Sequence, residues 1–238
     1  MASPLIKTFV WSSKIRLFHW LNVSCVFLLM ILGLMLFFDD PLDLSKQGKI
    51  LLKTIHTLVG YVFALNLLFR IVLGFIGKGF ERWSQTLPFT AAFRQELAQL
   101  KQNKNTVFKG HNPIGKLMVA ALFTLLSVQM VSGLMIASTD IYYPPLGNYF
   151  VQTIALDKNN LEVIKPYSKA NINPQAYDEM RTLRKPFKEA HEISFYLLLI
   201  LISLHIIAVI ISERKEKAAL VSAMIHGYKY LPKNDNNE

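Results

Sequence analysis

Six histidines are the residues of this sequence best suited to chemistry, because imidazole binds metals and gains or loses protons near neutral pH. They are His19, His56, His111, His191, His205 and His226. The first five lie within or at the ends of long apolar segments, where an ionisable side chain is costly and usually functional. A single histidine there is equally well explained by a hydrogen bond to a neighbouring helix, so the five must be considered together.

Two of them share one apolar segment. His191 and His205 lie 14 residues apart, which is close to four turns of an α-helix, so both side chains leave the same helix face. At a rise of about 1.5 Å per residue, they are separated by about 21 Å along the axis. The helix therefore presents two chemically equivalent positions near its opposite ends.

The composition indicates the kind of helices that carry these histidines. Of 238 residues, 52% are hydrophobic and 18% are charged, and the mean hydropathy is +0.31. Soluble domains carry about a quarter charged residues, so a membrane protein is expected and a disordered chain is excluded. The single cysteine, Cys25, excludes an internal disulfide framework. The net charge of +10 is spread between apolar blocks, so no nucleic-acid partner is expected.

Four segments are apolar enough to cross a bilayer, which takes about 20 residues: residues 17–38, 55–76, 114–137 and 193–212. Lys and Arg number 14 in the N-terminus, the second connection and the tail, against 10 in the other two connections. Positive charge favours the cytoplasmic side, so both termini are expected in the cytoplasm. We predict an all-α integral membrane four-helix bundle that forms one domain over residues 1–238.

Two connections contain further pattern. The third, residues 138–190, is too long for a simple turn between packed helices. Its tyrosines and prolines favour an ordered cap on the outer, periplasmic face over a floppy tether. In the second connection, apolar residues recur at helical spacing within FTAAFRQELAQLKQ, residues 89–102. This pattern predicts a short helix on the membrane surface.

The topology gives each histidine of the fourth segment a partner at matching depth. The first segment starts inside, so His19 lies opposite His205, and the second starts outside, so His56 lies opposite His191. Two cross-helix histidine pairs in a bundle core are the ligand set of two bis-histidine haems. The sequence lacks the CxxCH motif for covalent attachment, so non-covalent haem b is expected.

Three other interpretations of the four histidines compete with this one. Four unrelated interfacial histidines would have to match in both face and depth by chance. A proton relay, as in a small transporter or channel, usually includes intramembrane Asp or Glu, and the four segments carry acidic residues only at their ends. A zinc ion takes three or four protein ligands, and the two pairs are too far apart along the axis to supply them.

Three further residues are candidates for contact with the cofactors. Arg70 and Arg16 either pair with haem propionates or extend to lipid phosphates. His111, in GHNPIG at the start of the third segment, either contacts the inner haem propionates, a quinone or a third cofactor, or it holds the turn, and the turn is favoured. His226 is interpreted as a surface residue.

The sequence resembles the bacterial hydrogenase-type b cytochromes, which include the b-type cytochrome subunit of nickel-iron hydrogenases and related di-haem membrane cytochromes. The matching segments are IRLFHWLN, KTIHTLVGYVFALNLLFRIVLGFIG, GHNPIGKLMVAALF and HEISFYLLLILISLH. The resemblance implies a protein of the bacterial inner membrane in which His19 and His205 bind the inner haem, and His56 and His191 the outer one. It also implies electron transfer between membrane quinone and a periplasmic redox partner, such as a c-type cytochrome or an oxidoreductase subunit.

Transmembrane electron transfer is thus the expected function, and it requires no nucleophile or general base. The alternatives are a haem-containing anchor subunit of a larger oxidoreductase, and a direct reductase of a small oxidant such as superoxide. If quinone is the substrate, protons exchange near the inner haem, for which the sequence offers no firm acid or base.

Overall fold

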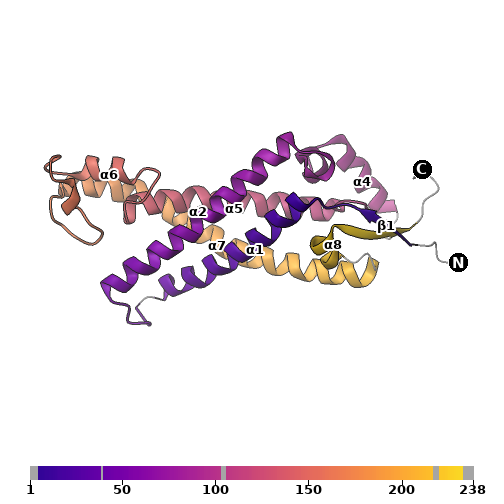
Figure 1. Cartoon of the computed structure of the whole chain (residues 1–238), viewed down its shortest axis with the longest axis horizontal. Coiled ribbons are helices and arrows are strands. Elements are labelled where there is room, and N and C mark those ends of the chain that lie inside the picture. Colours follow the sequence, from indigo (N-terminus) through magenta and orange to yellow (C-terminus); the bar gives the residue numbers. More distant parts are fainter. Residues whose placement is uncertain (1–4, 39, 103–105, 217–219, 233–238) are drawn as a thin grey trace. The chain divides into compact units, whose positions relative to one another are not determined.

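The computed structural model describes residues 5–38, 40–102, 106–216 and 220–232, and most of these residues are helical (Figure 1). Four long helices carry the apolar segments: α1 (Ser13–Phe37), α2 (Lys46–Ile76), α5 (Pro113–Asp140) and α7 (Pro174–Glu216). Each is long and apolar enough to cross a membrane. The predicted all-α class with four membrane-spanning helices is confirmed.

The long helices extend beyond the predicted segments, because hydropathy marks only the part that lies in hydrocarbon. α2 begins at Lys46 rather than near residue 55, and α7 begins at Pro174 rather than near residue 193. Proline suits the first helical turn, where its missing N–H has no partner to lose. The prediction of a connection over residues 138–190 is therefore wrong in length, since only residues 141–173 lie between α5 and α7.

Contacts within the chain divide it into two compact units. Unit 1 comprises residues 1–21, 66–125 and 198–238, and unit 2 comprises residues 22–65 and 126–197. Each unit thereby contains one part of each long helix. The histidines divide as well, with His19, His111 and His205 in unit 1 and His56 and His191 in unit 2.

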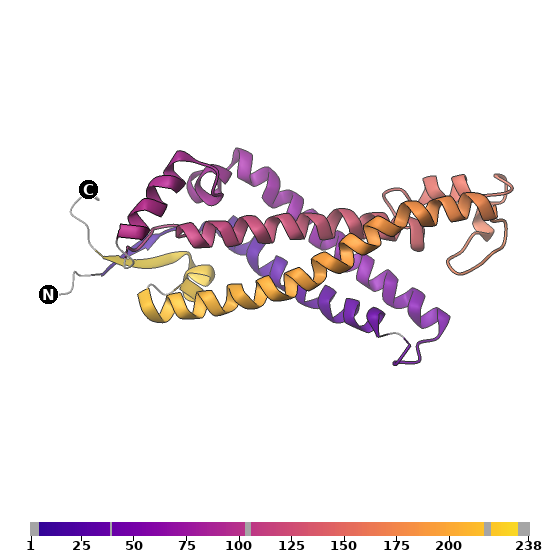
Figure 2. The ribbon, with the colours of Figure 1, turned by 180° about the vertical axis from the view of Figure 1, so that it is seen from behind.

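Unit 1 contains a two-stranded antiparallel sheet that the sequence analysis did not predict. β1 (Leu5–Phe9) pairs with β2 (Tyr228–Pro232), and the two strands lie side by side in both views (Figures 1 and 2). The helix α8 (Leu220–His226) precedes β2, and Gly227 between them has a φ of 93°. Glycine adopts this left-handed backbone without steric cost, so the chain can turn there from helix to strand.

A buried apolar cluster ties the ends of the chain to the long helices of unit 1. Its members are Val10, Trp11, Ile15, Leu73 and Ala223. Between α2 and α5 run three short helices, η1 (Gly79–Glu81), α3 (Trp83–Thr86) and α4 (Ala91–Gln102). The helix predicted within residues 89–102 is therefore present as α4.

Unit 2 carries an ordered cap over residues 141–173, as the tyrosines and prolines of this segment predicted. It contains α6 (Gly147–Ile154), which lies alongside the start of α7 (Figure 2), and η2 (Leu161–Val163). Apolar residues of the cap and of α7 form one core: Phe150, Ile154, Ile164, Ile172 and Met180. Burial of these side chains holds the cap against the helix.

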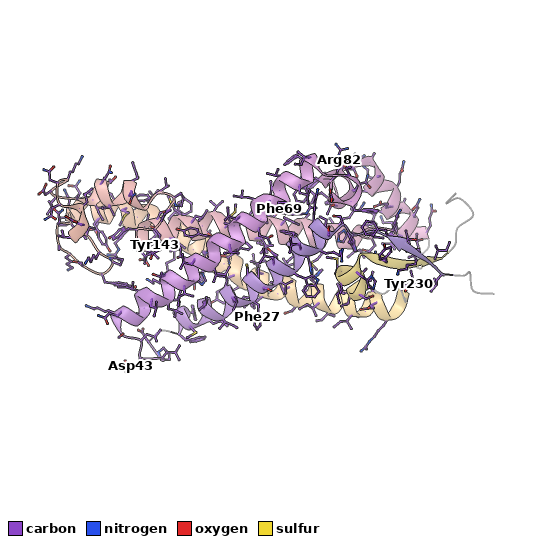
Figure 3. The ribbon with its side chains drawn as sticks, viewed as in Figure 1. Phe27, Asp43, Phe69, Arg82, Tyr143 and Tyr230 are labelled. Carbon is purple, nitrogen blue, oxygen red and sulfur yellow. The ribbon has the colours of Figure 1, made fainter. Side chains whose placement is uncertain are left out.

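Many large apolar side chains of the long helices face outward. Leu17, Leu65 and Phe75 are 68%, 69% and 69% exposed. Figure 3 labels two more exposed aromatic residues, Phe27 on α1 and Phe69 on α2. Proteins surrounded by water rarely expose so much contiguous apolar surface, whereas the tails of lipids solvate it.

Candidate functional sites

Unit 2 brings His56 of α2 and His191 of α7 face to face. The centres of their imidazole rings lie 6.4 Å apart, and the ring planes are inclined by 69°. Two imidazoles that share one metal ion through nitrogen bonds of about 2 Å each have ring centres roughly 6 Å apart. The pair therefore has the spacing that a metal ion held between two imidazoles requires.

Two side chains of α5 fix the position of His191. The Ser132 hydroxyl lies 3.0 Å from His191 Nδ1, and the Gln129 amide donates to the His191 carbonyl at 3.0 Å. A hydrogen bond at one ring nitrogen sets the orientation of the imidazole and leaves the other nitrogen for a metal. Neither residue was predicted from the sequence, because serine and glutamine are common in helices and their neighbours in space are not visible there.

Three glycines leave space around the same pair. A Cβ atom added at Gly33 of α1 would lie 3.5 Å from His56 Cε1, and one added at Gly133 of α5 would lie 3.2 Å from His191 Cε1. At Gly60, one turn after His56, a Cβ atom would meet no atom of the described residues within 4 Å. Larger side chains at Gly33 and Gly133 would occupy the space beside the rings.

A charged cluster of unit 2 joins the end of α5 to the two helices that carry the histidine pair. Asp140 Oδ2 accepts a hydrogen bond from Lys53 Nζ at 2.5 Å, and Asp140 Oδ1 accepts one from Arg184 at 2.5 Å. Lys53 precedes His56 by three residues and Arg184 precedes His191 by seven, spacings that place each cation near the face of its histidine. That spacing is visible in the sequence, where both cations were interpreted only as signals of membrane topology.

Unit 1 brings His19 of α1 and His205 of α7 within electrostatic reach of one another. The Nδ1 atom of His19 is buried and has no hydrogen-bond partner among the described residues, and the same is true of His56 Nδ1. Buried polar atoms nearly always have a partner. Both rings are therefore available to a bound group.

Arg16 lies beside this pair and connects α1 to α8. Its Nη1 donates to the Ile225 carbonyl, and Trp20 Nε1, four residues further along α1, donates to the Met224 carbonyl at 2.9 Å. Carbonyl groups at the end of a helix attract cations. Arg16 Nε is buried without a partner among the described residues, so the guanidinium retains a donor toward the interior.

Arg70 is buried inside unit 1, with 3% of its surface exposed. Its Nη1 donates to the Glu81 carbonyl at 3.0 Å, and its guanidinium carbon lies 4.2 Å from the centre of the Trp83 ring. The interpretation in which Arg70 extends to a lipid phosphate is therefore wrong. The hydrogen bond to the Glu81 carbonyl and the contact with the Trp83 ring hold the guanidinium inside unit 1.

His111 lies close to Trp11, with 4.8 Å between the ring centres. Burial lowers the pKa of the His111 imidazole to about 3. Neighbouring titratable groups act in the same direction, and they are Lys229, His205, Lys116 and Arg70. His111 is therefore neutral at physiological pH and lies near the His19 and His205 pair.

The turn that precedes α5 is held by Asn112 rather than by His111. Asn112 Oδ1 accepts a hydrogen bond from the Gly115 N–H at 2.7 Å, which caps the first turn of the helix. Lys229 Nζ of β2 donates to the Gly110 carbonyl at 2.7 Å. His226 is exposed and accepts from the Tyr228 N–H at 3.3 Å, as expected of a surface residue.

Within the described residues, no three His, Cys, Asp or Glu side chains gather at one metal position. Structural and catalytic zinc sites take three or four protein ligands. Within the described residues, each histidine pair supplies two ligands, fewer than such a zinc site takes.

The chain matches the family described as prokaryotic cytochrome b561 over residues 10–227. It is 26% identical over 138 residues to a probable Ni/Fe-hydrogenase B-type cytochrome subunit of Cupriavidus necator, covering 52% of this chain and 55% of that relative. It is 26% identical over 156 residues to a probable Ni/Fe-hydrogenase 1 B-type cytochrome subunit of Escherichia coli K12, covering 58% of this chain and 64% of that relative. The matches thus span between about half and two thirds of these relatives. No solved structure matches the chain.

Proposed function

Because the chain belongs to the prokaryotic cytochrome b561 family, we propose that it carries electrons across the bilayer through two haem b groups, one in each unit. Membership makes the protein a membrane b-type cytochrome in electron transfer, and a multi-pass protein of the bacterial inner membrane. The family also implies haem b as the cofactor. The number of haems, their ligands and the redox partners are our proposal.

The spacing of His56 and His191 carries the proposal. His56 and His191 would hold one haem between them, because imidazole is a common ligand of haem iron. The separation of 6.4 Å between the ring centres fits that arrangement. His19 of α1 and His205 of α7, which lie together in unit 1, form the second pair. Bound haem supplies one-electron chemistry, which its ligands and surroundings tune.

Other residues of the chain hold and orient the groups. In unit 2, Ser132 fixes the His191 ring, and Lys53 and Arg184 balance the carboxylates of the haem. In unit 1, Arg16 and Arg70 balance those of the second haem. Arg16 and Arg70 match two propionates in charge, whereas Lys53 and Arg184 share Asp140 and keep one net positive charge.

The electrons pass between membrane quinone at unit 1 and a periplasmic redox protein at unit 2. The excess of Lys and Arg in the termini and the second connection supports a cytoplasmic position for unit 1. Neutral His111 beside His205 offers a hydrogen bond to a quinone oxygen there. The names of the relatives support an oxidoreductase such as a hydrogenase as the partner, and a c-type cytochrome is the alternative.

A haem count on the purified full-length protein tests this proposal. We expect about two haem b per chain by pyridine haemochrome, and two midpoint potentials in a redox titration. His56→Ala and His205→Ala should each leave one haem and remove a different potential. The exposed His226→Ala is the matched control and should retain both. If His205→Ala leaves both haems with unchanged spectra, the pairing is wrong.

A haem-containing anchor subunit is the second candidate, favoured by the relatives' description as subunits. The two functions differ in the redox behaviour of the haems. Haems that equilibrate with both quinol and a periplasmic cytochrome support electron transfer. Haems that equilibrate with neither support the anchor.

A further inference from the structure

Unit 1 contains a cavity of about 600 Å³ apart from the histidine pair. Its walls come from the start of α1, the end of α2, η1 and the segment before α5. Small-molecule sites in proteins have volumes of about 300–1,000 Å³, so the cavity is large enough for part of a lipid or a cofactor.

One wall of the cavity is apolar and lies at a membrane end of two helices. It includes Ile15 and Leu73, which are buried, and Ile76, which is 75% exposed. Ile15 lies in the first turn of α1 and Ile76 is the last residue of α2. The opening is therefore at the level where hydrocarbon gives way to lipid headgroups.

The other part of the lining is basic. Lys14, Lys78 and Lys109 reach the cavity from three separate segments, and all three are exposed. None of them forms an ion pair within 4.0 Å with any carboxylate in the part of the chain that the structure describes. Three cations around one cavity attract an anion.

The lining has one carboxylate, Glu81, and that group is already engaged. It is 9% exposed and accepts a hydrogen bond from the Lys78 N–H at 3.0 Å. Burial by itself would raise its pKa, but hydrogen bonds from Ser12 and the Lys78 backbone, with the charges of Lys14 and Arg70, lower it. With three cations against one carboxylate, the lining keeps an excess of positive charge.

We propose that this cavity binds an anionic phospholipid, with the headgroup phosphate at the three lysines and the start of an acyl chain along Ile15, Leu73 and Ile76. Basic pockets between membrane helices take anionic lipid headgroups in this way. The uncharged head of a quinone makes no use of three cations. Inorganic phosphate shares the anionic chemistry but makes no use of the apolar wall.

Native mass spectrometry of the full-length holoprotein in detergent tests the charged part of the site. Phosphatidylglycerol is the probe, and phosphatidylcholine with the same acyl chains is the comparison. We expect the double variant Lys14→Gln/Lys109→Gln to weaken the preference for phosphatidylglycerol roughly 25-fold. Each lysine near an anionic lipid contributes about fivefold to binding, and the two factors multiply. Arg94→Gln/Lys101→Gln on α4 removes two cations from the same connection outside the cavity and should retain the preference.

A second variant tests the apolar wall. Ile76→Trp narrows the cavity at unchanged charge and should weaken phosphatidylglycerol binding at least fivefold, while millimolar inorganic phosphate should not displace the lipid. Equal binding of the two lipids, equal losses in both double variants, or displacement by phosphate alone would overturn the proposal. Haem content should stay constant in all these variants, so this test does not depend on the proposed haem ligands.

Discussion

In unit 2, the rings of His56 and His191 lie 6.4 Å apart, with a serine at one ring nitrogen and glycines beside both rings. In unit 1, His19 and His205 share their surroundings with a third histidine, His111, and with several cations. The two sites therefore use the same pair of residue types in different settings.

This difference indicates different tasks for the two sites. The unit 2 pair is oriented by its own hydrogen bonds, which suits a cofactor that only passes electrons. The unit 1 pair lies beside a neutral imidazole that can donate a hydrogen bond, which suits a substrate with a polar acceptor atom. The predictions below test this contrast.

The largest expected effect is on unit 2 alone. Gly133→Leu introduces a branched side chain where even a Cβ atom would lie 3.2 Å from His191 Cε1. We expect the haem count to fall from two to one, measured by pyridine haemochrome, with the unit 1 potential unchanged. Val131→Leu is the control because it enlarges a side chain of the same helix that is 54% exposed. If Gly133→Leu retained both haems, the space beside the His191 ring would not be part of a haem site.

A smaller effect is expected at the serine that orients His191. Ser132→Ala removes the 3.0 Å contact to Nδ1, and loss of such an outer hydrogen bond typically weakens metal binding about 10- to 100-fold. The measurement is the rate of haem transfer to apomyoglobin. Ser203→Ala, also in a long helix, removes only a bond to the Leu199 carbonyl. Equal rates in the two variants would refute the orienting role.

The charged cluster should set the potential of one haem. Asp140→Asn leaves Lys53 and Arg184 without their shared carboxylate, and the excess positive charge favours the reduced, less positive haem. We expect the unit 2 potential to rise by an amount on the order of 50 mV, measured by redox titration. Asp157→Asn in the cap should not change it. If only the midpoint potential of the unit 1 haem shifted, the charged cluster would belong to that haem instead.

The smallest effect concerns the acid stability of unit 1. The lowered pKa of Glu81 means that its contribution to stability is present above its ordinary value of 4.5 and is lost as pH falls through the folded value. Glu81→Gln should lower the unfolding free energy by about 1 kcal/mol at pH 7, the scale of one hydrogen bond. Thermal unfolding from pH 7 to pH 3 should show wild type and variant converging. If the difference in stability between wild type and Glu81→Gln grew as the pH fell, the lowered pKa of Glu81 would be contradicted.

The sequence was sufficient for the membrane helices, because they depend on local pattern, and it predicted which histidines lie together. Hydropathy marks the hydrocarbon segments, and helical periodicity gives His191 and His205 a common face. The unequal distribution of Lys and Arg between the connections gave the direction of each helix in the membrane. That direction predicted His56 as the partner of His191 and His19 as the partner of His205. The extensions of α2 and α7 were missed because hydropathy does not report helix outside the membrane.

The remaining parts of the sites depend on contacts between distant residues. Ser132 is recognisable only once His191 is beside it, and Asp140 only once two cations from other helices reach it. Arg70 was predicted to reach either a propionate or lipid, and its burial against Trp83 excludes lipid. β1 and β2 were missed because each strand has its partner at the other end of the chain.

That pairing has a consequence for the order in which the protein is made. β1 leaves the ribosome before any long helix, and β2 leaves it after all four. Both ligands proposed for unit 2 have been synthesised by residue 191, whereas unit 1 lacks its second strand until residues 228–232 emerge. Unit 1 therefore closes last during biosynthesis, so the haem proposed for it can enter before β1 and β2 pair.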